Sequence, residues 1–283
     1  MIKIGIIGNG FVGKATTSLQ CKDINVMAYD LNPKLCIPEG AKLEDLMSCD
    51  IIFISVPTPM KNTGECYLGY VEGVIQNLKE LKYNKNIVLR STVPVGTCDK
   101  LNCYFMPEFL TEKNYILDFK NNKDWIFGLK ENDNNEKKFK SIIEKLFTLA
   151  KENDKIKHNS ITFLSNKEAE LVKMFKNCFL ATKVSFCNEI YQFCQLKNVN
   201  YENVRKLAAN DDRIQHSHTK VPGPDGKLGF GGTCFPKDIS SLKYEMENAG
   251  MTPHILKSVI TRNETQDRTK KDWEDNKGRA VID

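Results

Sequence analysis

The chain opens with a short apolar run that leads directly into closely spaced glycines. Residues Ile2–Ile7 are followed by Gly8-Asn9-Gly10-Phe11-Val12-Gly13, after which the pattern is helix-compatible. In a strand–turn–helix unit of this kind, the first glycine permits a tight turn, the second lets backbone approach a pyrophosphate, and the third lets helix and strand pack closely. Because a helix N-terminus attracts anions, the segment predicts a dinucleotide site.

A carboxylate follows the next apolar run, as this kind of site requires. Asp30 directly follows the run 24–29 and lies seventeen residues after Gly13. In this position its carboxylate can accept both ribose hydroxyls and would repel a 2′-phosphate. We therefore expect NAD as the cofactor. Ligands bind beyond the carboxyl ends of strands, so Val56 and Thr58 are expected to line the same cleft. The alternative is a glycine-rich turn beside an ordinary surface aspartate.

Short apolar runs alternate with helix-compatible stretches over the first half of the chain. The strand-like runs lie at residues 2–7, 24–29, 51–56, 87–90, 103–106 and 125–129. Helix-compatible stretches include residues 11–21 and 71–81, and the polar run 131–138 predicts the start of another helix. This alternation favours a parallel sheet covered on both faces. We predict an α/β fold, with a Rossmann-type doubly wound sheet over residues 1–164.

From Ser165 the apolar residues recur three and four positions apart. The pattern continues to Leu196 and predicts one helix of about 30 residues, with Ser165 and Glu168 as its capping box. Such a long helix is typical of a spine between domains or of a subunit interface. It opens a helical central domain over residues 165–265. Residues 266–283 are almost entirely polar and predict a frayed or solvent-exposed tail.

Composition excludes several classes of partner. The 41 Lys and Arg residues are mixed with 36 Asp and Glu residues and form no basic run, so we expect no nucleic-acid partner. No apolar stretch approaches about 20 residues, so we expect no membrane partner. The ten cysteines form no Cys-x-x-Cys pair, and His216 and His218 lack supporting ligands, so no metal is expected. The cysteines are read as reduced thiols in a cytoplasmic protein.

The stretch 229–238 places a cysteine among glycines at the start of a helix. It reads Gly229-Phe230-Gly231-Gly232-Thr233-Cys234-Phe235-Pro236-Lys237-Asp238. The glycines let backbone approach a bulky ligand, and a helix N-terminus with a nearby lysine lowers the pKa of a thiol. Cys234 is therefore predicted to be a nucleophile that attacks a carbonyl. For the other nine cysteines we prefer the usual interpretation, a small buried side chain.

Five stretches together resemble the UDP-glucose 6-dehydrogenases of the wider UDP-glucose/GDP-mannose dehydrogenase family. They occur in the family's order and span residues 1 to about 265: residues 8–13, 91–97 (Ser-Thr-Val-Pro-Val-Gly-Thr), 107–112 (Pro-Glu-Phe-Leu-Thr-Glu), 170–177 (beginning Glu-Leu-Val-Lys and ending with Asn177) and 229–238. The resemblance implies two successive NAD-dependent oxidations of the sugar C6 alcohol, through a thiohemiacetal and a thioester on Cys234.

The resemblance also assigns roles to individual residues. Lys173 and Asn177 are implied to bind the oxyanion at C6, although Lys173 taken alone would be read as an exposed helix lysine. Asp238 is implied to hold or deprotonate the attacking water with Lys173 and Thr92, and Glu108 to act as base or water-positioner. The implied cofactor residues are Gly8, Gly10, Phe11, Val12, Gly13, Asp30, Lys34, Val56, Thr58, Thr92, Glu112 and Lys237. The implied substrate-binding residues are Glu108, Phe109, Leu110, Lys173, Asn177, Arg213, Phe230 and Gly231.

Arg213 is implied to reach the sugar of a partner subunit, which predicts a homodimer through the long helix; the alternative is a surface ion pair. The family's second Rossmann-like domain has no counterpart in the sequence, so we expect a short form. The loop 216–227 either replaces missing contacts or is a surface turn. UDP-glucose is the favoured substrate. GDP-mannose, a UDP-N-acetyl-hexosamine, or a non-catalytic binding subunit are the alternatives.

Overall fold

The computed structural model of the chain describes residues 1–282, which form two compact units. The first, here called the sheet unit, comprises Met1–Thr58 and Leu68–Lys173. The second, here called the helical unit, comprises Pro59–Tyr67 and the chain from Met174 onward. The chain therefore passes between the two units three times.

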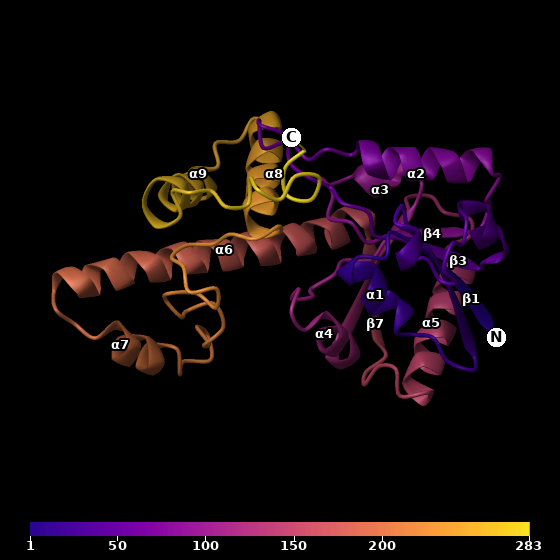
Figure 1. Cartoon of the computed structure of the whole chain (residues 1–283), viewed down its shortest axis with the longest axis horizontal. Coiled ribbons are helices and arrows are strands. Elements are labelled where there is room, and N and C mark those ends of the chain that lie inside the picture. Colours follow the sequence, from indigo (N-terminus) through magenta and orange to yellow (C-terminus); the bar gives the residue numbers. More distant parts are fainter. Residues whose placement is uncertain (283) are drawn as a thin grey trace. The chain divides into compact units, whose positions relative to one another are not determined.

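A seven-stranded sheet forms the centre of the sheet unit (Figure 1). Its order is β2-β1-β3-β4-β5-β6-β7, and all neighbouring strands are parallel except the antiparallel pair β5 and β6. The strands are β1 (Ile2–Ile7), β2 (Ile24–Tyr29), β3 (Ile51–Ile54), β4 (Asn86–Leu89), β5 (Tyr104–Phe105), β6 (Asp124–Leu129) and β7 (Ser160–Ser165). The six predicted strands are confirmed. The sequence reading missed β7, which is half-buried and runs directly into the next helix.

Alternate residues of the strands face two different apolar clusters. Ile4, Ile6 and Phe53 lie in a cluster with α1 (Phe11–Thr17), α4 (Tyr115–Asn121) and α5 (Glu136–Glu152). Ile52 and Ile54 lie in a cluster on the other face with α2 (Gly69–Glu80) and α3 (Thr97–Leu101). The predicted sheet covered on both faces is confirmed. Because β1 lies between β2 and β3, the strand order reverses at β1, which is where folds of this type bind ligands.

The helical unit is built around the long helix α6 (Asn166–Leu196), which begins in the sheet unit (Figure 1). Its predicted capping box is present: the Ser165 N–H donates to Glu168 Oε2 at 2.8 Å, and the Glu168 N–H donates to Ser165 Oγ at 3.3 Å. The remaining elements are α7 (Tyr201–Ala208), α8 (Phe235–Asn248), α9 (His254–Arg262) and the π-helical turn η3 (Asn263–Asp267).

The segment after η3 packs onto the helical unit. Trp273, Ala280 and Val281 are buried with Met60 beside them. The Met60 N–H donates to Ala280 O at 2.9 Å, and the Ile282 N–H donates to Met60 O at 3.1 Å. The prediction of a frayed tail is therefore wrong for the described residues. A few apolar anchors and backbone hydrogen bonds to the segment Pro59–Tyr67 outweigh the polar composition.

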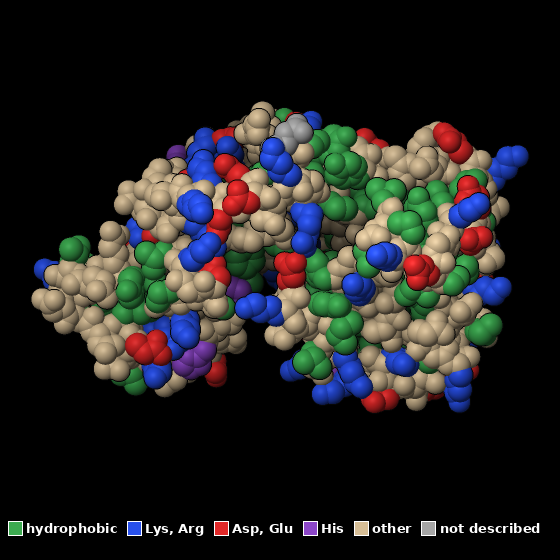
Figure 2. Space-filling view, viewed as in Figure 1, with side chains coloured by type: hydrophobic (Ala, Val, Ile, Leu, Met, Phe, Trp, Pro, Cys, Tyr) green, Lys and Arg blue, Asp and Glu red, His purple; other side chains and the backbone are tan. Residues whose placement is uncertain are grey.

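The surface shown in Figure 2 carries acidic and basic side chains interspersed with one another. Within residues 1–282, no helix combines the length and apolar character needed to cross a membrane.

Candidate functional site

The glycine turn between β1 and α1 is tightly enclosed at two glycines and open at the third. Gly8 has a φ of +86°, and a Cβ there would lie 2.8 Å from Ser55 O. A Cβ at Gly13 would lie 2.2 Å from Gly8 O, whereas a Cβ at Gly10 would meet nothing within 4 Å. The backbone at Gly10 therefore faces open space, which a ligand phosphate could enter.

Asp30 stands at the carboxyl end of β2 with its carboxylate oriented by backbone. Its Oδ2 accepts the Asn9 N–H at 2.7 Å, and its Oδ1 accepts the Asn32 N–H at 2.9 Å. The first of these bonds joins the carboxylate to the glycine turn itself, as a ribose-binding group requires. Lys34 lies nearby in the chain, in the short 3-10 helix Pro33–Leu35, with its side chain exposed.

The carboxyl ends of β3 and β4 are joined by two side-chain hydrogen bonds. Thr58 Oγ1 donates to Thr92 O at 2.7 Å, and Ser91 Oγ donates to Val56 O at 2.6 Å. These contacts bring Val56, Thr58 and Thr92 to the same edge of the sheet as the glycine turn. The open space at Gly10, the oriented Asp30 carboxylate and this edge together fit a dinucleotide.

Phe11, at the first position of α1, packs edge-on against Tyr115 of α4, with ring centroids 6.3 Å apart. Glu112 lies in the exposed loop before α4. Both residues were implied to contact the cofactor. Phe11 therefore connects α1, which follows the glycine turn, with α4, which follows the loop 106–114.

Glu108 and Lys173 form a buried ion pair within the sheet unit. Lys173 Nζ donates to Glu108 Oε1 at 2.6 Å and to Glu108 O at 2.7 Å, and the two side chains are 4% and 7% exposed. The Leu110 N–H donates to the other carboxylate oxygen at 2.9 Å, and Lys173 Nζ lies 5.7 Å from the centre of the Phe109 ring. The interpretation of Lys173 as an exposed helix lysine is therefore wrong.

The charge state of Glu108 follows from this pairing. Burial alone would raise the pKa of Glu108, but the ammonium of Lys173, the Leu110 N–H and the Arg90 guanidinium together hold that pKa below its usual value. Glu108 is thus ionised at neutral pH, and Lys173 keeps a charged partner. This arrangement suits a group that positions water and a cation better than one that must accept a proton near neutral pH.

Arg90 is a buried charge that the sequence reading treated only as the last residue of a strand. Its guanidinium donates to Val12 O at 3.3 Å and to Thr16 Oγ1, so it binds α1 near both ends of the helix. Burial lowers the pKa of Arg90 to about 10, which still leaves it charged at neutral pH. The available signal was an arginine within an otherwise apolar run, since arginine is rarely fully buried without partners.

A second group of polar side chains surrounds the start of α8 in the helical unit. Asn177 Nδ2 donates to Asp238 Oδ2 at 2.5 Å, and Lys237 Nζ donates to Asp238 Oδ1 at 2.6 Å. The Asp238 N–H donates to Cys234 O at 3.0 Å, and the Asp238 side chain is 1% exposed. Three residues implied to serve catalysis, Asn177, Asp238 and Cys234, thus lie close together with Lys237.

Lys237 carries a positive charge next to the cysteine. Burial alone would lower the pKa of Lys237, but the electrostatic effect of the neighbouring Asp238, Cys234 and Cys66 side chains raises it above its usual value. A permanent ammonium in this position favours the thiolate form of a neighbouring cysteine. No direct hydrogen bond between Lys237 and the thiol is needed for this effect.

Cys234 differs from most cysteines of the chain in its exposure. It is the N-cap residue of α8 and is half-buried, and Thr233 Oγ1 lies 3.8 Å from its sulfur. Of the other nine cysteines, eight are buried and only Cys21 is half-buried. A cysteine that is not fully buried and stands at a helix N-terminus is the arrangement expected for a nucleophile.

Phe230 lies inside the helical unit. The residue is 5% exposed and packs in an apolar cluster with Met174 and Phe235. Its N–H donates to Asn263 Oδ1, and its carbonyl accepts from Asn263 Nδ2, both at 2.9 Å. These contacts make Phe230 an anchor of the loop. Gly231 beside it is half-exposed.

Arg213 is exposed and pairs with a neighbour in its own chain. Its guanidinium donates to Asp211 at 2.6 and 2.9 Å, and its side chain is 88% exposed. Within this chain it therefore forms a surface ion pair. The described residues 1–282 contain no group of three or more His, Cys, Asp or Glu side chains arranged to hold a metal ion.

The fold and the glycine turn define a dinucleotide-binding protein of the Rossmann class. Residues 41–150 match the NAD binding domain of the UDP-glucose/GDP-mannose dehydrogenase family, and residues 167–265 match the central domain of that family. Together the two matches cover more than half of the chain. The chain belongs to the UDP-glucose/GDP-mannose dehydrogenase family.

Individual relatives agree with this assignment. The chain is 31% identical to a UDP-glucose 6-dehydrogenase of Rickettsia prowazekii, over 90% of this chain and 62% of the relative. It is 34% identical to that of Rickettsia conorii, over 77% of this chain and 50% of the relative. The solved UDP-glucose dehydrogenase of Pyrobaculum islandicum superposes with a TM-score of 0.77 at 25% identity, over 93% of this chain and 68% of that one. The chain thus spans between half and about three-fifths of these two curated relatives.

Proposed function

We propose that this protein oxidises the primary alcohol of a nucleotide sugar to a carboxylate, with NAD as oxidant and UDP-glucose as the favoured substrate. The observation that carries the proposal is the half-buried Cys234 at the start of α8, beside the ion pair of Lys237 with the buried Asp238. A protein that only bound nucleotides would not need a thiol in such surroundings. The names of the curated relatives favour UDP-glucose among the substrates.

The glycine turn, Asp30 and the edge formed by Val56, Thr58 and Thr92 would hold the cofactor. NAD supplies the oxidising power, because each bound molecule accepts one hydride and two are needed to take an alcohol to an acid. Lys173 and Asn177 would stabilise the negative charge on the substrate oxygen. Lys173 is suited to this role because Glu108 keeps a charge opposite it.

Cys234 would hold the substrate carbon between the two oxidations. Its thiolate adds to the aldehyde carbon, a C–S bond forms, and the oxygen takes up a proton to give a thiohemiacetal. Oxidation of this adduct leaves a thioester. Water then adds to the acyl carbon, the C–S bond breaks, and the thiolate leaves as the acid is released.

Asp238 and Glu108 would position the attacking water. Each oxygen of Asp238 accepts one hydrogen bond, from Asn177 or from Lys237, and retains a lone pair for a water molecule. Glu108 is ionised and fixed by Lys173. Both carboxylates are therefore acceptors with defined directions.

The test is an NADH assay with a panel of nucleotide sugars: UDP-glucose, GDP-mannose and UDP-N-acetyl-hexosamines. We expect two NADH per UDP-glucose. Replacing the nucleophile, Cys234→Ala, should lower acid formation by at least about 10³-fold while NAD binding is retained. The matched control is Cys21→Ala, which removes the other half-buried thiol and should leave the rate unchanged. If Cys234→Ala makes acid at the wild-type rate, covalent catalysis is wrong; if no sugar is oxidised, a binding role remains.

We also propose a homodimer through α6. Four phenylalanines at spacings of four and seven residues lie along one side of this helix, and each is more than half exposed: Phe175, Phe179, Phe186 and Phe193. The first two stack on each other, with ring centroids 6.2 Å apart. A continuous apolar face of this kind usually marks a protein interface. Sedimentation equilibrium of the double variant Phe179→Asp/Phe186→Asp should show monomers where the unmodified chain is dimeric; an unchanged mass for the variant would rule out this face.

We also propose the cytoplasm as the location of this protein, because all ten cysteines are thiols outside disulfides, as is usual in a reducing compartment.

A further inference from the structure

The loop that leads to Cys234 has a sequence that cannot hold a fixed shape unaided. Three of the four residues 229–232 are glycines, and Gly229 and Gly232 have φ values of +65° and +73°. Glycine has more backbone freedom to lose on folding than any other residue. A nucleophile that follows directly after such a loop needs outside contacts to fix its position.

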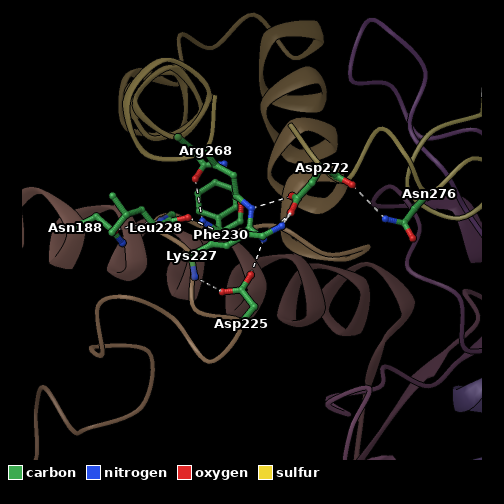
Figure 3. A network of polar contacts seen from close by, with 10 residues as sticks. Asn188, Asp225, Lys227, Leu228, Phe230, Arg268, Asp272 and Asn276 are labelled. Carbon is green, nitrogen blue, oxygen red and sulfur yellow. Dashed lines mark hydrogen bonds and ion pairs between the residues drawn. The ribbon is translucent and has the colours of Figure 1, made fainter. Parts of the chain in front are cut away.

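Arg268 supplies contacts of this kind from the segment after η3. Its guanidinium lies between two carboxylates, as Figure 3 shows. Nη2 donates to Asp225 Oδ2 at 2.5 Å, while Nε and Nη2 donate to the two oxygens of Asp272 at 2.8 and 2.9 Å. Nη1 also donates to Leu228 O at 3.3 Å, immediately before the glycines. The side chain of Arg268 is only 7% exposed.

The same guanidinium lies against the glycine loop itself. A Cβ on Gly231 would come within 2.6 Å of both Cζ and Nε of Arg268. Gly231 precedes Cys234 by three residues. A side chain at position 231 would therefore have to displace the guanidinium from its present position.

The charges around Arg268 are balanced. Lys227 Nζ pairs with Asp272 Oδ2 at 2.5 Å, so two cations face two carboxylates. The pairing of Arg268 with Asp272 is bidentate, a geometry that lysine cannot reproduce. Removal of the arginine would take a hydrogen-bond donor from Asp272 and from Leu228 O, whereas the Asp225 side chain is 47% exposed and would be hydrated instead.

Asp225 belongs to the turn 222–226, for which the sequence left two interpretations open. The structure shows that one end of the turn reaches a buried arginine and that Gly223 N–H donates to Lys227 O at 2.8 Å. The turn therefore does more than reverse the chain at the surface. It presents a carboxylate that fixes Arg268 from the side opposite Asp272.

We propose that Arg268 is a positioning residue for Cys234: held by Asp225 and Asp272, it fixes the glycine loop 228–232 and thereby the direction of the thiol. In this role Arg268 acts on Cys234 through the loop, which it contacts at Leu228 and Gly231. The inference rests on the proposed role of Cys234 as nucleophile.

The test compares Arg268→Gln with Lys270→Gln, which removes the same charge from an exposed position two residues away. We expect Arg268→Gln to speed amide hydrogen exchange in residues 228–234 and to change the rate at which iodoacetamide alkylates Cys234 by more than twofold. For the proposed oxidation, kcat should fall by about 10- to 100-fold at an unchanged KM for NAD, because the thiol is misplaced while the glycine turn is intact. Lys270→Gln should match the unmodified protein in all three readouts.

Two further variants separate positioning from general stability. Arg268→Lys keeps the charge without the bidentate geometry and should restore the thermal midpoint more fully than it restores kcat. Asp225→Asn removes the charge of one of the two carboxylates that hold Arg268, while the pairing with Asp272 remains. If Arg268→Gln fails to fold, Asp225→Asn takes its place in these measurements. The proposal is overturned if Arg268→Gln lowers the thermal midpoint but has the same amide exchange, the same rate of Cys234 alkylation and the same kcat as Lys270→Gln.

The exchange and alkylation measurements need no substrate. If the unmodified protein oxidises no nucleotide sugar, the proposed function fails, and these two measurements still decide whether Arg268 fixes the loop. If the enzyme is active but the two measurements do not respond to Arg268→Gln, the positioning role fails while the function stands.

Discussion

The two glycine-rich turns of this protein are held in place by different means. The turn 8–13 is enclosed by backbone: Gly8 N–H donates to Tyr29 O at 2.9 Å, and Gly13 fits against Gly8 O. The turn 229–232 is held by side chains from distant parts of the sequence. Asn263 and Arg268 bind the backbone of Phe230 and Leu228, and Asn188 Oδ1 accepts the Gly229 N–H at 3.1 Å.

This difference decides how each turn responds to mutation. A turn enclosed by backbone has little tolerance for added volume but depends on few side chains. A turn held by side chains fails when any one of them is removed, because buried N–H and C=O groups then lose their partners.

The largest effect is expected from Asn263→Ala. The Asn263 side chain is 1% exposed and satisfies both the N–H and the carbonyl of Phe230. Two buried backbone groups would be left unpaired, so the free energy of unfolding should fall by about 2 to 4 kcal/mol, measured by urea denaturation. Gln266→Ala, which shortens an exposed amide side chain three residues away, is the control. Equal stability of the two variants would show that the second turn does not depend on Asn263.

A smaller but substantial effect is expected from Gly13→Ala. The new Cβ would lie 2.2 Å from Gly8 O, and overpacking of this kind lowers the free energy of unfolding by about 1 to 3 kcal/mol. A Cβ at Gly10 would meet no atom of the protein within 4 Å, so Gly10→Ala should leave the free energy of unfolding unchanged. The new methyl group would occupy the space expected for the pyrophosphate, so NAD binding should weaken, measured by fluorescence titration. If both variants bind NAD as the unmodified protein does, the glycine turn is not the phosphate site.

The smallest effect concerns pH and distinguishes the two turns by charge. Burial raises the pKa of Asp225, but its bond to Arg268 brings the net value below the usual range; Arg268 likewise lowers the pKa of Asp272. Carboxylates with depressed pKa values stabilise the fold above their unfolded pKa of about 3.9 and lose this contribution as pH falls further.

The stability difference between the unmodified protein and Arg268→Gln should therefore be constant from about pH 7 to about pH 5 and shrink below about pH 4 in urea denaturation. The difference for Gly13→Ala should not change over the same range, because the clash of the new Cβ with Gly8 O involves no titratable group. If the stability difference between the unmodified protein and Arg268→Gln does not depend on pH, the ion pairs of Arg268 with Asp225 and Asp272 contribute little to the free energy of unfolding.

The sequence was informative where structure follows from local pattern. Strand–turn–helix spacing predicted the glycine turn, and the pair Ser165 and Glu168 predicted the start of α6. It was uninformative where the decisive partner lies far along the chain. Nothing near Lys173 indicates its burial against Glu108, 65 residues earlier, and only the family resemblance pointed to a site there.

The C-terminal residues illustrate the same limit. Trp273 and Arg268 sit in a stretch so polar that composition predicts exposure, yet both are buried. Their burial depends on Met60 and Asp225, which belong to other segments. Hydrophobic periodicity cannot detect such contacts, because a single anchor has no period.

The discontinuity of the helical unit has a consequence for biosynthesis. Residues Pro59–Tyr67 leave the ribosome well before Ala280, whose carbonyl accepts the Met60 N–H. At usual translation speeds the interval is roughly 10 to 45 seconds. During this time the segment Pro59–Tyr67 lacks the C-terminal residues with which its backbone forms hydrogen bonds. A fragment that starts at Met174 would never acquire that partner, so this half of the molecule cannot be obtained intact by cutting the gene at the boundary between the units.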